Sequence, residues 1–137
     1  MTEAEKRAVF RQWRQLVNMR VSELQRFLDE YGNEAGLSRE AASKQGIKSG
    51  RDSARALIRM LEKLGGEKRI ALALDRWNES DWRWAKRQVS FIQRMRGTAA
   101  DVMSRGNEPY YDSKGRPKRL LLALNLWGHK PNGRLAK

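Results

Sequence analysis

The chain has 137 residues, of which 33% are charged and 39% hydrophobic, and its formal net charge at pH 7 is +13. It has no cysteine, which excludes disulfides and thiolate metal sites and suits a reducing cytosol. The longest apolar run, residues 120–126, is too short to span a membrane, and the charged first residues do not resemble a signal peptide. We therefore expect a cytoplasmic protein without a membrane partner, folded as a single helical domain over residues 1–137.

The positive charge is unevenly distributed along the chain. Residues 1–36 contain equal numbers of basic and acidic side chains, whereas residues 37–137 carry the whole excess. A charge-balanced start joined to a basic remainder indicates a scaffold that carries a surface for a polyanion.

Apolar residues recur with helical period in nearly every segment, and no segment has the pattern of a strand. The predicted elements, in chain order, are helices over 3–17, 22–31, 38–46, 49–64, 67–74 and 79–96, a loop over 98–115, and a last helix over 117–127. Ser22 and Gln25 predict a capping box, Asn78 or Ser80 a cap for the long helix, and Gly97 its end. The expected fold is all-α, a compact bundle of about five to six helices around the apolar C-terminal helix.

Two of the predicted helices have clearly divided faces. In the helix over 49–64, four cations spaced four residues apart lie opposite the apolar side: Arg51, Arg55, Arg59 and Lys63. In the helix over 79–96, the corresponding side has four cations and no acid between them: Arg83, Lys86, Arg87 and Arg94. Phosphates would relieve the repulsion between these like charges and release counterions. For either helix alone, a basic face that meets only solvent is the alternative.

The start of the last helix is a second basic region. Four cations cluster there: Lys114, Arg116, Lys118 and Arg119. Cations at this end oppose the helix dipole, whereas the free backbone N–H groups favour an anion. Tyr110 and Tyr111 precede them and could stack on a base or sugar, or pack against the core instead. Ser49, preceded by Lys48, marks another helix start that could hold an anion.

Enzyme activity is not expected. Residues 46–49 resemble only the tail of a phosphate-binding loop, and residues 38–57 depart from a helix-turn-helix because Asp52 and Arg55 replace apolar residues. The single histidine, His129, cannot anchor a metal site without cysteines and is expected to bond a backbone group beside Trp127. A carboxylate-only magnesium site, as in nucleases, is the remaining alternative, but the acids are scattered. We expect no cofactor. Most tryptophans should lie in the core, with Trp77 as the exception.

Several sequence blocks occur in a characteristic order. They are Val17-Asn18-Met19 with Glu23-Leu24, then Ser49-Gly50-Arg51 with Arg55 and Ile58, then Asp81 with Val89 and Arg94, and finally Leu124-Asn125-Leu126-Trp127-Gly128-His129 with Pro131. In this order they resemble a family of small uncharacterised bacterial and fungal proteins that are labelled as DNA-binding. Similar blocks occur in phage and mobile-element proteins. The resemblance implies DNA binding and brings no catalytic residues. The chain departs from the family in its acid-balanced start and in residues 99–108.

The expected function is non-enzymatic binding to nucleic acid, to DNA more than RNA, through phosphates and with low sequence specificity. The expected contacts are Lys48, Ser49, Arg51, Arg55, Arg59, Arg83, Lys86, Arg87, Arg94, Tyr111, Lys114, Arg116, Lys118 and Arg119. The competing hypothesis is a phage or mobile-element interaction module. As an inhibitor or accessory factor, it would dock on a nucleoprotein machine or an acidic protein.

Overall fold

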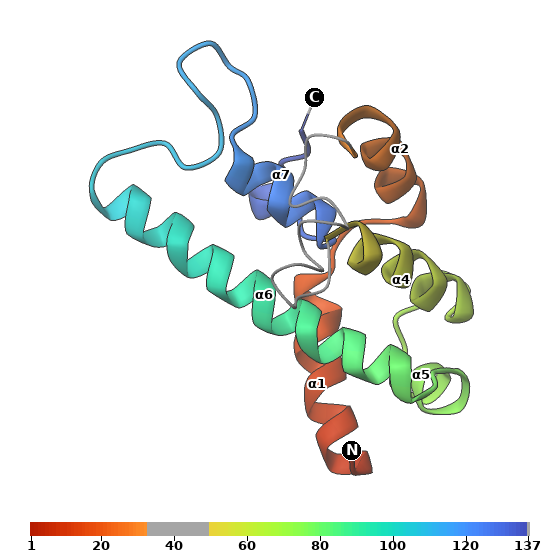
Figure 1. The fold of residues 1–137 in the computed structure, drawn as a ribbon. Coiled ribbons are helices and arrows are strands. Elements are labelled where there is room, and N and C mark those ends of the chain that lie inside the picture. The colour runs from red at the N-terminus through yellow and green to blue at the C-terminus, as the bar shows by residue number, and fades with distance from the viewer. Residues whose placement is uncertain (33–49, 137) are drawn as a thin grey trace, which may run out of the picture.

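The structure is a computed structural model that describes residues 1–32 and 50–136. In chain order the elements are α1 (Glu3–Leu16), α2 (Val21–Tyr31), α4 (Gly50–Lys63), α5 (Ile70–Arg76), α6 (Glu79–Ser104), α7 (Arg119–Leu126) and the short 3-10 helix η1 (Pro131–Gly133) (Figure 1). The described residues form no strand, so the predicted all-α class is confirmed. The predicted helix over 38–46 lies outside the described residues. None of the described helices is long and apolar enough to cross a membrane.

The packing is arranged around α7. Leu121, Leu124 and Leu126 are fully buried there, and α7 contacts α2, α4 and α6. Helix α1 crosses α6 and packs against it, while α4 and α6 run side by side (Figure 1). The buried apolar residues form one connected core. The prediction of a bundle around a buried C-terminal helix is therefore confirmed, because a helix that is apolar nearly all round must be buried on several sides.

The second helix begins one residue earlier than predicted. Its capping box uses Glu23, whose carboxylate accepts a hydrogen bond from the Arg20 N–H at 3.0 Å. The same carboxylate binds the ammonium group of Lys130 at 2.8 Å. The expected box of Ser22 and Gln25 is therefore wrong. Lys130 lies far from Glu23 in the sequence, so a local sequence pattern cannot predict their contact.

Helix α6 is the longest element, with 26 residues, or about 39 Å. The predicted cap at Asn78 is confirmed, since its side chain accepts from the Asp81 N–H at 2.9 Å and the Asp81 carboxylate accepts from the Asn78 N–H at 3.0 Å. The predicted end at Gly97 is wrong. The helix continues because Ala99 is buried against the core, and it ends near Gly106, which has the positive φ (+79°) typical of a helix end.

The loop between α6 and α7 projects from the bundle as a narrow hairpin (Figure 1). Its two arms are joined by hydrogen bonds from the Lys118 N–H to the Tyr110 carbonyl (2.8 Å) and from the Asp112 N–H to the Arg116 carbonyl (2.9 Å). Gly115, with a φ of +78°, closes the turn at its tip. The loop therefore begins later than the predicted residue 98, because α6 extends to Ser104. Its last part forms a hydrogen-bonded hairpin.

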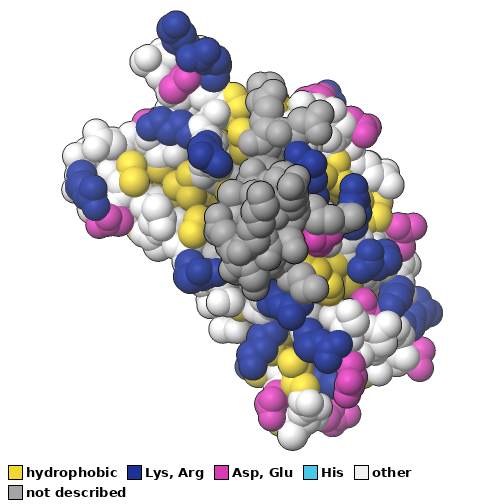
Figure 2. Space-filling view, viewed as in Figure 1, with side chains coloured by type: hydrophobic (Ala, Val, Ile, Leu, Met, Phe, Trp, Pro, Cys, Tyr) yellow, Lys and Arg dark blue, Asp and Glu magenta, His cyan; other side chains and the backbone are white. Residues whose placement is uncertain are grey.

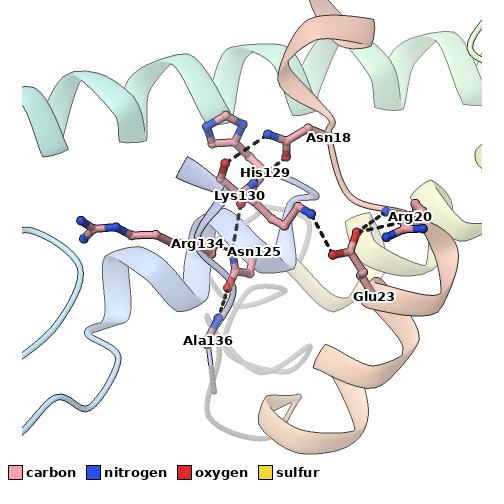
Figure 3. A network of polar contacts seen from close by, with 8 residues as sticks. All are labelled: Asn18, Arg20, Glu23, Asn125, His129, Lys130, Arg134 and Ala136. Atoms are coloured by element: carbon pink, nitrogen blue, oxygen red, sulfur yellow. Dashed lines mark hydrogen bonds and ion pairs between the residues drawn. The ribbon is translucent and has the colours of Figure 1, made fainter. Parts of the chain in front are cut away.

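A polar network joins the segment after α1 to the segment after α7 (Figure 3). The Asn18 side chain accepts from the Lys130 N–H at 2.7 Å and donates to the Lys130 carbonyl at 3.1 Å. The Gly128 carbonyl accepts from the backbone N–H groups of Asn18 and Met19. Asn125, which is fully buried, donates from its amide to the carbonyls of His129 and Arg134. These bonds close the chain on itself around α7.

Candidate nucleic-acid interface

The basic row on α6 consists of Arg83, Lys86, Arg87 and Arg94, all of which are exposed. The rotation of α6 is fixed by Gln88 on the opposite side, which is fully buried. The Gln88 side chain accepts from the indole N–H of Trp13 at 2.8 Å and donates to the Ser53 hydroxyl at 3.3 Å. A buried amide with satisfied partners on two other helices sets the helix in one orientation. The row therefore faces solvent as the sequence predicts.

Two arginines of the α6 row lie over aromatic rings. The guanidinium of Arg87 is 5.2 Å from the ring centre of Trp84, and that of Arg94 is 5.8 Å from Phe91. Phe91 in turn stacks on Trp127 at 4.2 Å. Cation–π contacts of this kind restrict a guanidinium without neutralising its charge. The charged groups of the row are thereby positioned yet remain open to an anion.

The acids of the described residues are mostly bound to other cations. Ion pairs join Glu3 with Arg7, Glu23 with Lys130, Glu30 with Arg26, Asp81 with Lys63, Asp101 with Arg105, and Glu108 with Arg134. No ion pair between described residues involves a member of the α6 row. The row thus keeps its four positive charges.

Among the described residues, two acids share a groove with the start of the α6 row. There, Arg83 and Lys86 line a groove of about 310 Å³ that also contains Glu5, Lys6 and Glu79. The two carboxylates weaken the positive potential at this end. Arg87 and Arg94 are not among the residues that line this groove.

The basic row on α4 is only partly as expected. Arg55 and Arg59 are exposed, but Arg51 is half-buried and its Nε has no hydrogen-bond partner. Lys63, which continues the row, forms a 2.5 Å ion pair with Asp81, a carboxylate that is almost fully buried. The C-terminal end of the α4 row is therefore structural, and two exposed arginines are left for a ligand.

The structure does not combine the α4 and α6 rows into one face. The two helices meet where Gln88 bonds Ser53. At 100° per residue, Arg55 and Arg59 lie about 200–240° around α4 from that contact, and Arg83 and Arg94 lie about 220–240° around α6. Both rows thus point away from the contact between the helices and form separate surfaces.

The hairpin uses several of its predicted ligands for its own stability. The Arg116 guanidinium binds the Asp112 carboxylate at 3.0 Å, and the Lys118 ammonium donates to the Glu108 carbonyl at 2.6 Å. The Arg116 N–H and further hydrogen bonds to the same carboxylate lower the pKa of Asp112, which holds it in the charged form. Half-buried Tyr111 lies beneath the guanidinium of Arg134 at 5.8 Å. These contacts do not favour the expected stacking of Tyr111 on a base.

Of the four cations at the start of α7, two are exposed and have neither an ion pair nor a side-chain hydrogen bond among the described residues, Lys114 and Arg119. The other two have the structural contacts given above. Lys48 and Ser49 lie outside the described residues. Figure 2 shows Lys and Arg side chains at the hairpin and at many other places on this face, with Asp and Glu side chains mostly toward its edges.

His129 has a structural position. Its Nδ1 donates to the Leu16 carbonyl at 2.6 Å, which confirms the expected bond to a backbone group. The partner is not beside Trp127 in the chain, as expected, but 113 residues away from His129. Burial lowers the pKa of His129 and the charge of Arg96 lowers it further, while the bond to Leu16 opposes them. Among the described residues, no group of three or more His, Asp or Glu side chains could hold a metal ion.

The tryptophans also differ from the expectation at one position. Trp77 is buried, and its indole N–H donates to the Met60 carbonyl at 3.1 Å. Because Trp77 lies between two predicted helices, the sequence suggested that its side chain belongs to a loop outside the core. However, the aromatic cluster of Phe10, Trp13 and Trp82 surrounds it, with ring centres between 4.8 and 5.5 Å away.

Sequence reasoning overlooked a group of arginines on α1. Arg11 and Arg14 are exposed and have no ion pair with a described residue. Residues 1–36 contain equal numbers of acidic and basic side chains, so their net charge gives no sign of these arginines. A net charge along the chain ignores where the side chains point. Their spacing with Arg7 on one side of a helix was the available signal.

In the comparison with known proteins, no family model, no curated protein sequence and no solved structure matches this chain. The resemblance to small DNA-binding proteins therefore stays a prediction. In the structure, several residues that carry it lie together in the network that closes the chain, among them Asn18, Glu23, Asn125 and Gly128 (Figure 3). Such contacts give these residues a structural reason to occur together.

Proposed function

We propose that the protein binds nucleic acid without catalysing a reaction, and that the α6 row is its main contact. One observation carries this proposal. The four cations of the row are exposed and have no ion pair with a described residue, while most described acids are bound elsewhere. Four like charges along one side of a helix repel one another. Phosphates that line up along α6 would remove that repulsion.

The interaction would depend mainly on phosphates. Each neutralised phosphate releases counterions, so affinity falls steeply as salt concentration rises. The aromatic rings beside the row offer little surface for base stacking, because Trp84 and Trp127 are each only 8% exposed. Low sequence specificity follows, since phosphate contacts carry no direct sequence information. The preference for DNA rests on the family resemblance.

The other cations would make secondary contacts. Arg55 and Arg59 on α4, and Lys114 and Arg119 at the hairpin, are exposed and carry no ion pair with a described residue. These cations lie on elements other than α6, so a short duplex bound along α6 would not contact all of them. We propose that they add affinity on longer nucleic acids.

Binding to a labelled duplex, a single strand and an RNA hairpin tests the proposal. The variant Arg83→Ala/Arg87→Ala/Arg94→Ala should bind each of them much more weakly than the unmodified protein near 50 mM salt. A matched control removes three cations that are held in ion pairs: Arg26→Ala/Arg69→Ala/Arg105→Ala. It lowers the net charge equally and should retain most of the affinity. A second variant, with lysines at positions 83, 87 and 94, should also retain it.

Two results would contradict the proposal. Equal weakening by the α6 variant and the control would mean that net charge alone attracts the ligand. If the unmodified protein bound none of the three probes near 50 mM salt, nucleic acid would not be the partner. The competing interaction module, with an acidic protein as its ligand, would then be the better account.

A further inference from the structure

A groove between α1 and α5 has the composition of an anion site. It has a volume of about 490 Å³ and is lined by Arg7, Phe10, Arg11, Arg14, Gln15 and Ile70. Three of these are arginines and none is an acid, in contrast to the groove beside α6, which contains two carboxylates. The groove therefore concentrates positive charge in a part of the chain whose composition is neutral overall.

The arginines of the groove form a row on one side of α1. Arg7, Arg11 and Arg14 lie within about 60° of one another around the helix axis and extend over about 10 Å along it. Arg7 forms only an exposed, 3.7 Å ion pair with Glu3. Arg11 and Arg14 have no ion pair with a described residue. The acids among residues 1–32 lie at the start of α1 and on α2, and none of them lines the groove.

Neighbouring cations strengthen the field at the inner end of the row. Lys68 is half-buried and donates from its ammonium group to the Val17 carbonyl. Burial lowers the pKa of Lys68, the nearby charges of Lys130 and Arg14 lower it further, and the charge of Glu23 opposes them. Arg14 is thus close enough to another cation for mutual repulsion, which a bound anion would relieve.

The shape of the row favours an extended ligand. Its floor is formed by Phe10, which is 2% exposed, and half-buried Ile70, so neither ring stacking nor a deep pocket is offered. Three guanidinium groups in line match a chain of phosphates, each of which a guanidinium can bind through paired hydrogen bonds. The groove also faces away from α6. Trp13 marks where α1 meets α6, and the three arginines lie about 100–160° around α1 from it.

We infer that the groove between α1 and α5 is a second surface for the phosphate backbone of nucleic acid, separate from the α6 row. This inference rests on the proposed function. A protein with two such surfaces can hold two segments of nucleic acid, or one segment that bends around it.

The test compares salt dependence for a labelled duplex. The variant Arg11→Ala/Arg14→Ala should lower the slope of log Kd against log salt by about 1.8, since each lost phosphate contact removes about 0.9. The control Arg26→Ala/Arg105→Ala, which removes two ion-paired cations, should leave the slope unchanged. The variant Arg11→Lys/Arg14→Lys should retain it. Circular dichroism confirms that each variant is folded.

The outcomes separate this inference from the proposed function. If the α6 variant loses slope and the Arg11/Arg14 variant does not, the groove is not a phosphate surface, and the proposed role of α6 stands. If only the Arg11/Arg14 variant loses slope, the groove stands and α6 is not the main contact. Reductions that add when the two sets are combined support two separate surfaces. No binding by the unmodified protein overturns both.

Discussion

Gly128 shows how one residue closes this fold. It follows α7 with a φ of +90°, a conformation that residues with a side chain rarely adopt. A Cβ atom there would lie 2.8 Å from Leu57 Cδ1 and 3.3 Å from Val17 Cγ1. Its carbonyl accepts two hydrogen bonds from the segment after α1. Backbone conformation and close packing therefore both require glycine at this position.

Gly128→Ala should lower the free energy of unfolding by about 2–4 kcal/mol, which combines the cost of a positive φ with that of overpacking. Gly133→Ala is the matched control, because Gly133 also has a positive φ (+75°) but no heavy atom within 4 Å of a Cβ. It should cost only about 1–2 kcal/mol. Urea unfolding of both variants measures the difference. Equal losses would show that packing around Gly128 contributes nothing.

At the scale of elements, α6 shows what local sequence signals can and cannot predict. The period of its apolar residues predicts its existence and the row of cations opposite them. The predicted length of α6 is wrong. A glycine at position 97 is typical of a helix end, but the helix continues beyond it because Ala99 is buried against the core. The capping box of α2 failed for a related reason, since Glu23 is shared with Lys130 from the far end of the chain. Contacts between distant segments decide such details.

Gly97 provides a prediction about α6. A Cβ atom at this position meets no heavy atom within 4 Å, and Gly97 is not among the glycines with a positive φ. Gly97→Ala should therefore raise the free energy of unfolding by about 0.5–1 kcal/mol, because glycine is a poor helix former. Gly106→Ala, at a φ of +79°, should instead lower it. Destabilisation by Gly97→Ala in urea unfolding would mean that the helix does not continue through this residue.

At the scale of the whole molecule, the buried bond from His129 to Leu16 ties the end of α1 to the segment after α7. The ordinary pKa of a histidine is 6.5, and burial lowers it for His129 in the fold. The unfolded chain therefore takes up a proton near pH 6.5, whereas the folded chain does so only at lower pH. The free energy of unfolding should fall as the pH drops below 6.5.

His129→Asn tests this closure, because an amide nitrogen can replace the Nδ1 donor without titrating. Urea midpoints of the unmodified protein should fall between pH 7 and about 5.5, and those of the variant should not. The range lies above the ordinary pKa of 4.5 for glutamate, which keeps carboxylates such as Glu23 out of the comparison. A fall of equal size in both proteins would assign the pH dependence to another group.

The distribution of charge over the whole molecule was predicted only in part. The sequence predicts the α6 row because all its members lie within one helix. It does not show that Lys63 and Arg116 are engaged in ion pairs, or that the α4 and α6 rows face apart. It also hides Arg11 and Arg14, since their charge is balanced by acids that lie elsewhere in space. A count of charges along the sequence does not contain this information, because the position of each residue around its helix decides which charged side chains lie close together.

The salt dependence of duplex binding tests the central claim most directly. If the α6 row binds phosphates, the slope of log Kd against log salt should be about 2.7 smaller for Arg83→Ala/Arg87→Ala/Arg94→Ala than for the unmodified protein, at about 0.9 for each contact. The control that removes three ion-paired arginines should keep the original slope. A slope that is the same in the α6 variant and the unmodified protein would contradict the claim that these arginines contact nucleic acid.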